Sequence, residues 1–335
     1  MNLTLIGWDE AWAESAAARC GVPGRVARVD RGVCSVLTAQ GVVRASLSGA
    51  VLDSMARDSL STPCTGDWVM VRTWPDDRLT LEEVLPRRSA VVRGTVSERS
   101  EGQVLAANAT AVAVVVGLDR EPSVTKVERL VAVAWESGAV PLVLLTKSDL
   151  AADAHDVATD VAAAAPGVDV LTCSTVTLDG IEQLRARITP ADTMALVGSS
   201  GAGKSSLANA LAGAPLLVTK RIRDDGRGRH TSVRRELVPL PGGGTLVDTP
   251  GLRGVGLFET GDGVAATFPD VEALVARCRF ADCVHATEPD CAVRKALESG
   301  GLSARRYESW QRLQREVDWI ARRTAARKRA DEKRR

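Results

Sequence analysis

The stretch Gly198-Ser199-Ser200-Gly201-Ala202-Gly203-Lys204-Ser205-Ser206 decides how this chain is interpreted. It follows the apolar run 194–197 and precedes a helical pattern that ends at Gly213, so we expect a buried strand, a glycine-rich turn and a helix. Glycines let backbone N–H groups approach a phosphate chain, and the helix N-terminus adds partial positive charge. Lys204 can reach the β- and γ-phosphates, and the Ser205 hydroxyl can ligate Mg²⁺. An ordinary loop is the alternative, but the full G-x-x-x-x-G-K-S spacing predicts that all nine residues form a nucleoside triphosphate site.

Composition narrows the class of protein. The 335 residues allow two or three domains, and 43 Lys plus Arg against 42 Asp plus Glu leave the overall charge uninformative. No apolar run approaches the roughly 18–20 residues that span a bilayer, and residues 1–10 lack the pattern of a secretion signal. Seven cysteines, three of them between 278 and 291, suit a reducing compartment. We therefore expect a cytoplasmic protein with no membrane partner. We also expect a monomer.

Short β-type runs follow an Ala-rich helical stretch at residues 12–19. They are Val26–Val29, Val33–Leu37, Val42–Leu47, Asp67–Arg72 and Leu79–Val84. Five short strands with Gly, Ser and Asp between them predict a small barrel, with an OB-fold as one candidate and a sandwich as the alternative.

Strands and helices alternate in the central part of the chain. Apolar runs at 111–116, 142–145 and 170–171 alternate with helical patterns, and the helix that follows the third run is expected to be capped by Asp179 and to end at Ile188. This alternation predicts a parallel sheet with right-handed crossovers, and the phosphate loop belongs to the same series.

Thr146-Lys147-Ser148-Asp149 ends one buried strand, where α/β folds bind ligands. Asp149 can accept the N1–H and the exocyclic N2 hydrogens of guanine, which adenine does not offer, and the Lys147 stem can lie along the base. The segment around Ser174 can place backbone groups on the base. Alone this tetrapeptide is common on surfaces; beside a phosphate loop it favours GTP over ATP.

Two later segments fit the phosphates. In Asp248-Thr249-Pro250-Gly251, Asp248 would hold Mg²⁺ through a water and the Gly251 N–H would meet the γ-phosphate. In the Gly- and Arg-rich segment 223–232, Thr231 is the expected switch hydroxyl on Mg²⁺, with Ser232 as second choice. A solvated basic turn is the alternative for this segment. Base reading thus precedes the phosphate loop, which precedes both switches, so the expected site is circularly permuted.

His230, which directly precedes Thr231, is the best candidate in the chain to position the water that attacks the γ-phosphate. The position after the Asp-x-x-Gly motif, where GTPases carry a Gln, is Leu252 here, and it cannot hydrogen-bond. With Lys204 and Thr231, His230 completes the expected catalytic set.

Cys278, Cys283, His285 and Cys291 have the spacing C-x4-C-x-H-x5-C. Three thiolates and an imidazole make a closed tetrahedral set for one structural zinc ion per chain. Ordinary buried cysteines with an incidental histidine are the alternative.

The C-terminal segment 303–335 is basic, with twelve Lys or Arg and five Asp or Glu. Together with the basic stretch 220–235, it fits a polyanionic partner such as RNA, with a solvated charged tail as the alternative. Its apolar stripe of Trp310, Leu313, Val317 and Ile320 is expected to make core contacts.

With these motifs, and with Gly66-Asp67-Trp68-Val69, the chain resembles the RsgA (YjeQ) family of circularly permuted GTPases of small-subunit maturation. The resemblance implies an rRNA-contacting OB-fold, a permuted GTPase domain, a C-terminal helical zinc domain, and slow hydrolysis stimulated by the small subunit. Thr146 departs from the family's commoner Asn, and Ser232 from its second Thr. We expect an extension (1–22), an OB-like barrel (23–95), the GTPase domain (96–258) and the zinc-binding helical domain with a basic tail (259–335).

Two other functions compete with a GTPase of 30S maturation. One is an RNA-binding assembly protein in which the nucleotide is a structural ligand. The other is a P-loop ATPase or kinase, opposed by Asp149 and by the lack of a recognisable acceptor site.

Overall fold

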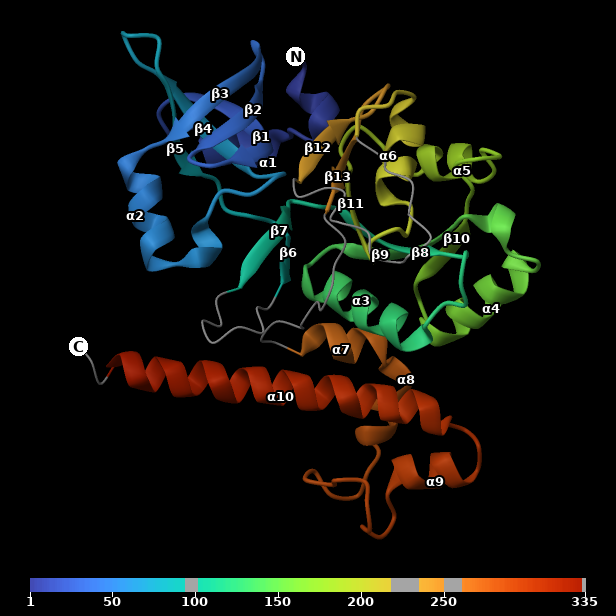
Figure 1. Ribbon diagram of the computed structural model, residues 1–335. Coiled ribbons are helices and arrows are strands. Elements are labelled where there is room, and N and C mark those ends of the chain that lie inside the picture. Colours follow the sequence, from blue (N-terminus) through green and yellow to red (C-terminus); the bar gives the residue numbers. More distant parts are fainter. Residues whose placement is uncertain (94–101, 218–234, 250–260, 333–335) are drawn as a thin grey trace.

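The computed structural model describes residues 1–93, 102–217, 235–249 and 261–332 (Figure 1). Its three parts are a closed β-barrel, a six-stranded α/β sheet and a C-terminal group of helices. The predicted fold class is confirmed. The N-terminal segment, with η1 (Leu3–Ile6) and α1 (Glu10–Ala16), packs on the barrel through Trp8, whose ring lies 4.7 Å from that of Trp68.

The barrel closes in the strand order β1-β2-β3-β5-β4. Its strands are β1 (Val22–Asp30), β2 (Val33–Thr38), β3 (Gly41–Leu47), β4 (Trp68–Thr73) and β5 (Leu79–Val84). Two helices, α2 (Gly49–Arg57) and η2 (Ser59–Ser61), connect β3 to β4. Inward-facing apolar side chains such as Val26, Val36, Val69 and Leu81 fill the interior. Five strands in this order with a helix after the third form the OB-fold, so the OB alternative was correct and the sandwich was wrong.

The central sheet has the order β10-β9-β8-β11-β13-β12. Its strands are β8 (Ala111–Gly117), β9 (Val140–Thr146), β10 (Asp169–Thr172), β11 (Thr193–Gly198), β12 (Glu236–Pro239) and β13 (Thr245–Asp248). All neighbours are parallel except β12, which runs antiparallel to β13. The predicted parallel sheet is confirmed, whereas the short edge strand β12 was missed.

Helices cover both faces of this sheet. They are α3 (Val124–Glu136), α4 (Ala154–Ala164), α5 (Ile181–Ala186) and α6 (Lys204–Ala212), whereas the short η3 (Ser148–Leu150) lies in the loop after β9. Alternate residues of β8 serve the two faces: Val112 and Val114 join the core that contains α3, and Ala113 and Val115 join the core that contains α6. One detail of the sequence analysis was wrong, because α5 is capped by Gly180, with φ 71°, rather than by Asp179.

A two-stranded hairpin, β6 (Ala90–Arg93) with β7 (Gln103–Ala107), lies between the barrel and the sheet. Figure 1 shows it below the barrel, beside the central sheet. This hairpin was not predicted from the sequence.

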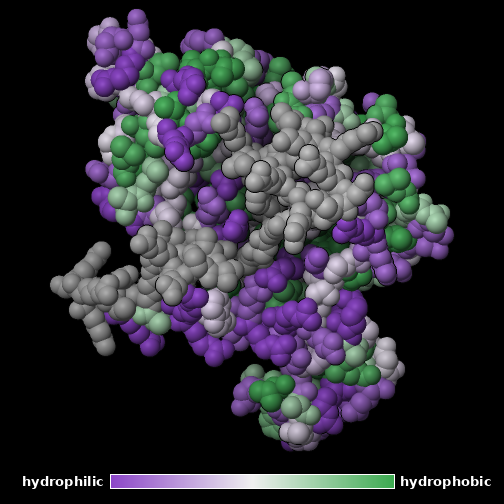
Figure 2. All heavy atoms as spheres, in the orientation of Figure 1, coloured by the Kyte–Doolittle hydropathy of each residue, from purple (hydrophilic) through white to green (hydrophobic). Residues whose placement is uncertain are grey.

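The C-terminal helices are α7 (Asp262–Thr267), α8 (Pro269–Val275), α9 (Ala292–Glu298) and the long α10 (Ala304–Glu332). In Figure 1, α7 lies between α3 and α10, with α9 below. Leu313 and Val317 of α10 are buried in the core shared with α3, and Trp310 and Ile320 pack against it, as the stripe predicted. Along α10 the visible surface is mostly hydrophilic (Figure 2).

A buried carboxylate ties α10 to the sheet domain. Glu128 of α3 is fully buried and accepts hydrogen bonds from Arg305, from Arg306 at 2.9 Å and from Ser309 at 2.6 Å. Arg306 also bonds Asp270 of α8 at 2.7 Å. A buried charge is tolerated when it is paired and hydrogen-bonded, as here, so this cluster fixes the orientation of α10.

A buried arginine joins the barrel to the sheet. Arg25 of β1 is 1% exposed, and its donors reach the backbone oxygens of Ile6, Gly66 and Asn108 and the hydroxyls of Thr193 and Thr245. Burial lowers the pKa of Arg25 to about 9, with an opposing effect of Asp67, so it stays charged at neutral pH. Because Thr193 begins β11 and Thr245 begins β13, one barrel side chain secures the starts of two central strands.

Candidate functional site

The glycine-rich loop leads from β11 into α6, as the sequence predicted. Gly198, Gly201 and Gly203 all have positive φ, a conformation that side chains disfavour. A Cβ on Gly198 would lie 2.3 Å from the carbonyl oxygen of Val115, so only glycine fits there. The loop therefore brings the N-terminus of α6 to the carboxyl edge of the sheet, where an anion is favoured.

Lys204, the first residue of α6, lies inside this loop. Its Nζ donates to the carbonyl oxygens of Gly198, at 3.1 Å, and Ser199, at 2.9 Å, and the side chain is 6% exposed. Burial lowers the pKa of Lys204, and the nearby Asp248 carboxylate opposes this effect. These two hydrogen bonds hold the Lys204 ammonium in the loop where the phosphates would bind.

Ser205 and Asp248 form the candidate magnesium site. The Ser205 hydroxyl donates to Asp248 Oδ2 at 2.7 Å, and Asp248 is the last residue of β13, 2% exposed. Its other oxygen, Oδ1, is buried and has no hydrogen-bond partner among the residues that the structure describes. Burial raises the pKa of Asp248, against the lowering effects of Ser205 and Lys204. A hydroxyl and an unpaired carboxylate oxygen are hard donors that fit Mg²⁺.

Thr146 links the base-reading segment to the phosphate loop. It ends β9, is 2% exposed, and donates from Oγ1 to the carbonyl oxygen of Ala202 at 2.6 Å. A second contact reaches the Val116 carbonyl at 3.3 Å. The residue that departs from the family's usual Asn therefore still joins the two motifs.

Asp149 is oriented by Ser174, whose hydroxyl donates to Asp149 Oδ1. Ser174 is fully buried and accepts from the backbone N–H groups of Val176 and Thr177. The Ser148 N–H donates to the carbonyl of Cys173 at 3.2 Å, which joins the two loops. Sequence reasoning expected backbone contacts from Ser174; its side-chain role was missed, since no spacing rule pairs residues 149 and 174.

The remaining predicted nucleotide residues, His230, Thr231, Ser232 and Gly251, lie outside the described residues. Ser200 lies in the phosphate loop, and Ser206 lies in the first turn of α6.

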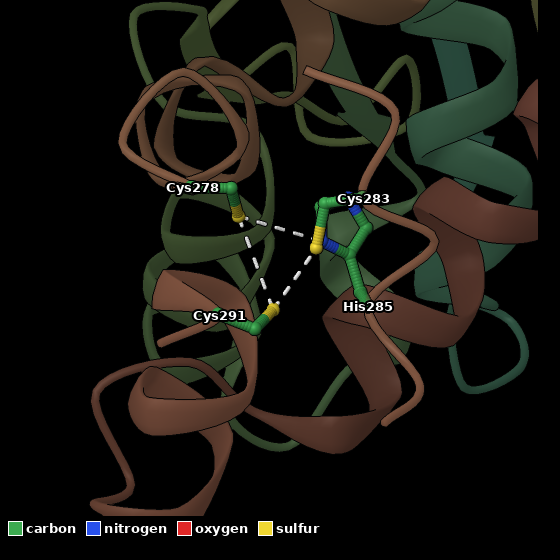
Figure 3. A group of neighbouring side chains, drawn as sticks. All are labelled: Cys278, Cys283, His285 and Cys291. Atoms are coloured by element: carbon green, nitrogen blue, oxygen red, sulfur yellow. Dashed lines mark hydrogen bonds between the residues drawn. The ribbon is translucent and has the colours of Figure 1, made fainter. Parts of the chain in front are cut away.

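Cys278, Cys283, His285 and Cys291 converge, with their ligand atoms all within 4.8 Å of one another (Figure 3). Cys278 Sγ lies 3.9 Å from Cys291 Sγ and 3.5 Å from His285 Nδ1. Tetrahedral bonds of about 2.3 Å would place sulfur ligands roughly 3.8 Å apart, so the cluster matches zinc geometry. Burial lowers the pKa of His285, which favours the neutral imidazole that a metal needs, although Glu288 opposes this effect.

Glu288, missed by the sequence analysis, shapes the loop between the ligands. Its carboxylate accepts from the backbone N–H groups of Val284, Ala286 and Thr287. Hydrogen bonds from its own N–H and that of Val284 lower the pKa of Glu288 to about 2. The loop holds His285 at φ 61°, an uncommon conformation that orients the imidazole toward the thiols.

Every helix in the described ranges is too short or too polar to cross a lipid bilayer.

Comparisons with known proteins agree with this geometry. The family model described as RsgA GTPase matches residues 84–258. A protein named small ribosomal subunit biogenesis GTPase RsgA from Streptomyces coelicolor is 49% identical over 98% of this chain and 90% of its own length. A namesake from Opitutus terrae is 41% identical over 96% of this chain and 92% of its own.

Two solved structures share the fold. YjeQ from Thermotoga maritima has a TM-score of 0.64 at 23% identity, over 88% of this chain and 98% of that one. YloQ, described as a circularly permuted GTPase, has a TM-score of 0.61 at 22% identity, over 90% of this chain and 96% of that one.

Proposed function

The chain belongs to the RsgA GTPase family, and we propose that its phosphate-loop site binds GTP with Mg²⁺ and hydrolyses it during maturation of the small ribosomal subunit. The observation that carries the site assignment is the 2.6 Å hydrogen bond from Thr146 to Ala202, because it joins the base-reading motif to the phosphate loop. Base, phosphates and metal ligands then meet along one edge of the sheet, where α/β folds bind ligands.

Each part of this edge has a distinct role. Residues 198–206 present backbone N–H groups to the phosphates, and Lys204 neutralises the β- and γ-phosphates. Ser205 and Asp248, with Thr231 from the switch segment, would hold Mg²⁺, which offsets charge on the phosphates. Asp149, held by Ser174, reads the guanine edge.

The other parts of the chain are proposed to face the ribosomal subunit. We assign RNA contacts to the OB barrel and to the basic C-terminal helix, and a structural role to the zinc site. The excess of Lys and Arg over Asp and Glu in residues 303–335, on a helix whose visible surface is mostly hydrophilic (Figure 2), supports the assignment for α10. A monomer in the cytoplasm, without a membrane partner, remains part of the proposal, as do the domain limits near residues 23, 96 and 259.

Turnover tests the proposal against a purely structural nucleotide. Purified full-length protein should hydrolyse GTP slowly alone and several-fold to many-fold faster when purified small subunits are added. Phosphate release with and without subunits measures this, with large subunits as the control. A nucleotide that stays bound and is not consumed faster would favour the RNA-binding assembly protein instead.

The zinc site gives a separate prediction. One zinc ion per chain should be found by elemental analysis, and Cys283→Ser should lose it and lower the thermal midpoint by roughly 5–15 °C. The reason is that the four ligands hold the segment 276–290, which contains no helix or strand, to the start of α9. Cys20→Ser, at an exposed cysteine, should change neither zinc content nor midpoint. A folded wild-type protein without zinc would refute the assignment.

A further inference from the structure

Lys147 has an unusual backbone conformation for a lysine. Its φ is 59° and its ψ is 36°, in the left-handed region. The surrounding hydrogen bonds enforce this: the Leu118 N–H donates to the carbonyl of Thr146 at 2.8 Å, and the Leu150 N–H donates to that of Lys147 at 3.0 Å. Such strain persists where the neighbouring structure determines it, so the direction in which the Lys147 side chain leaves the loop is fixed.

The stem of Lys147 crosses the end of the adjacent strand β8. A Cβ built on Gly117, the last residue of β8, would lie 3.5 Å from both Cδ and Cε of Lys147. The same Cβ would lie only 2.6 Å from Asp119 Oδ1. Glycine at position 117 therefore leaves room for the lysine stem and the aspartate carboxylate to meet over the backbone.

The head of Lys147 is bound by this aspartate. Lys147 Nζ lies 2.9 Å from Asp119 Oδ1, and the two side chains are 23% and 31% exposed. An ion pair so accessible to water adds little to the stability of the fold. It does fix a long, rotamer-rich side chain before any ligand arrives, which lowers the ordering cost of binding.

We propose that Asp119 is a positioning residue for guanine binding. Its carboxylate holds the Lys147 ammonium, so that the aliphatic stem forms one wall of the slot for the guanine ring. Asp149, two residues further along the same loop, then reads the edge of that ring. The inference rests on the proposed function, because it assigns a neighbour to the same base-binding segment.

This role predicts effects on binding rather than on bond cleavage. The stem of Lys147 contacts the face of the base, which guanine and hypoxanthine share, so GDP, GTP and inosine diphosphate should be affected alike. Because the ion pair is partly exposed, its contribution should shrink as salt increases. Loss of Asp149 would differ, since it should affect guanine more than hypoxanthine.

The test uses the full-length protein with Mg²⁺ and a fluorescent GDP analogue. Asp119→Ala should raise the Kd and the KM for GTP roughly 3- to 10-fold, with kcat unchanged at saturation. Asp119→Glu should restore most of the affinity. Asp160→Ala, at an exposed aspartate of α4, is the matched control and should bind as the wild type does.

A double-mutant cycle separates positioning from general damage. If Asp119 acts through Lys147, the variant with both Asp119→Ala and Lys147→Ala should bind GDP no more weakly than Lys147→Ala alone. Additive losses, or a Kd for Asp119→Ala equal to that of the wild type at low salt, would overturn the inference while leaving the proposed function intact. Wild-type protein that binds no guanine nucleotide would overturn both.

Discussion

Asp149→Asn is expected to weaken GTP binding by roughly 10²-fold and to strengthen binding of xanthosine triphosphate. The carboxylate accepts from N1–H and from the N2 amino group of guanine; an amide can accept only one of these and would turn a donor toward the other. Xanthine carries a carbonyl in place of that amino group, so the amide suits it. The hydrogen bond from Ser174 already fixes the side chain at this position. Asp149→Asn therefore changes only whether one atom of the group accepts or donates a hydrogen bond.

Competition between the two triphosphates for a fluorescent GDP analogue measures this exchange. Asp160→Asn, on the exposed face of α4, is the matched control and should keep the preference for GTP. Equal loss of both triphosphates would indicate misfolding, and unchanged GTP affinity would remove Asp149 from the base site.

His230→Ala is expected to leave GTP affinity intact and to abolish most of the stimulation of hydrolysis by small subunits. Leu252 stands where GTPases carry a Gln and cannot orient water, so another group must do so. Half of the residues from 220 to 235 are Lys, Arg or His, so RNA would attract and order this segment. A water-orienting or general-base role is worth about 10²–10⁴ in rate.

The chain supplies a matched control for this substitution. His155 lies on α4 and is exposed, so His155→Ala should retain full stimulation. Single-turnover hydrolysis with saturating subunits separates the chemical step from product release. Full stimulated turnover by His230→Ala would assign the role to RNA or to another residue.

Local patterns were enough to predict the motifs and the order of the parts. The phosphate loop, the base-reading segment and the zinc ligands each span fewer than fifteen residues. The spacing of residues within each motif is therefore enough to predict which ligand it binds. The buried runs of β8 and β9 identified a parallel sheet for the same reason. Thr146 and Ala202 were each assigned to a motif, but the bond between them could not be predicted, because it depends on how two loops pack.

The features that were not predicted are short strands, a backbone cap and a contact between two loops. The edge strand β12 is only four residues long, and β6 finds its partner β7 ten residues further on. Asp119 carries no motif, and only the close approach of β8 and β9 brings it to Lys147. The sequence predicted Asp179 as the cap of α5, but the cap is Gly180. Gly180 has a left-handed backbone conformation, and no side-chain oxygen caps this helix.

The buried Arg25 has a consequence for how the protein is made. The barrel is synthesised first. Its Arg25 can bond Thr193 and Thr245 only after these residues have been translated, 168 and 220 residues later. Until then its guanidinium lacks these two hydroxyl partners. Domains generally fold as units during synthesis, N-terminal first. Here the barrel can close early, but its last hydrogen bonds form only when the strands of the phosphate loop and the magnesium ligand have been translated. Final maturation of the first domain is thereby tied to completion of the second.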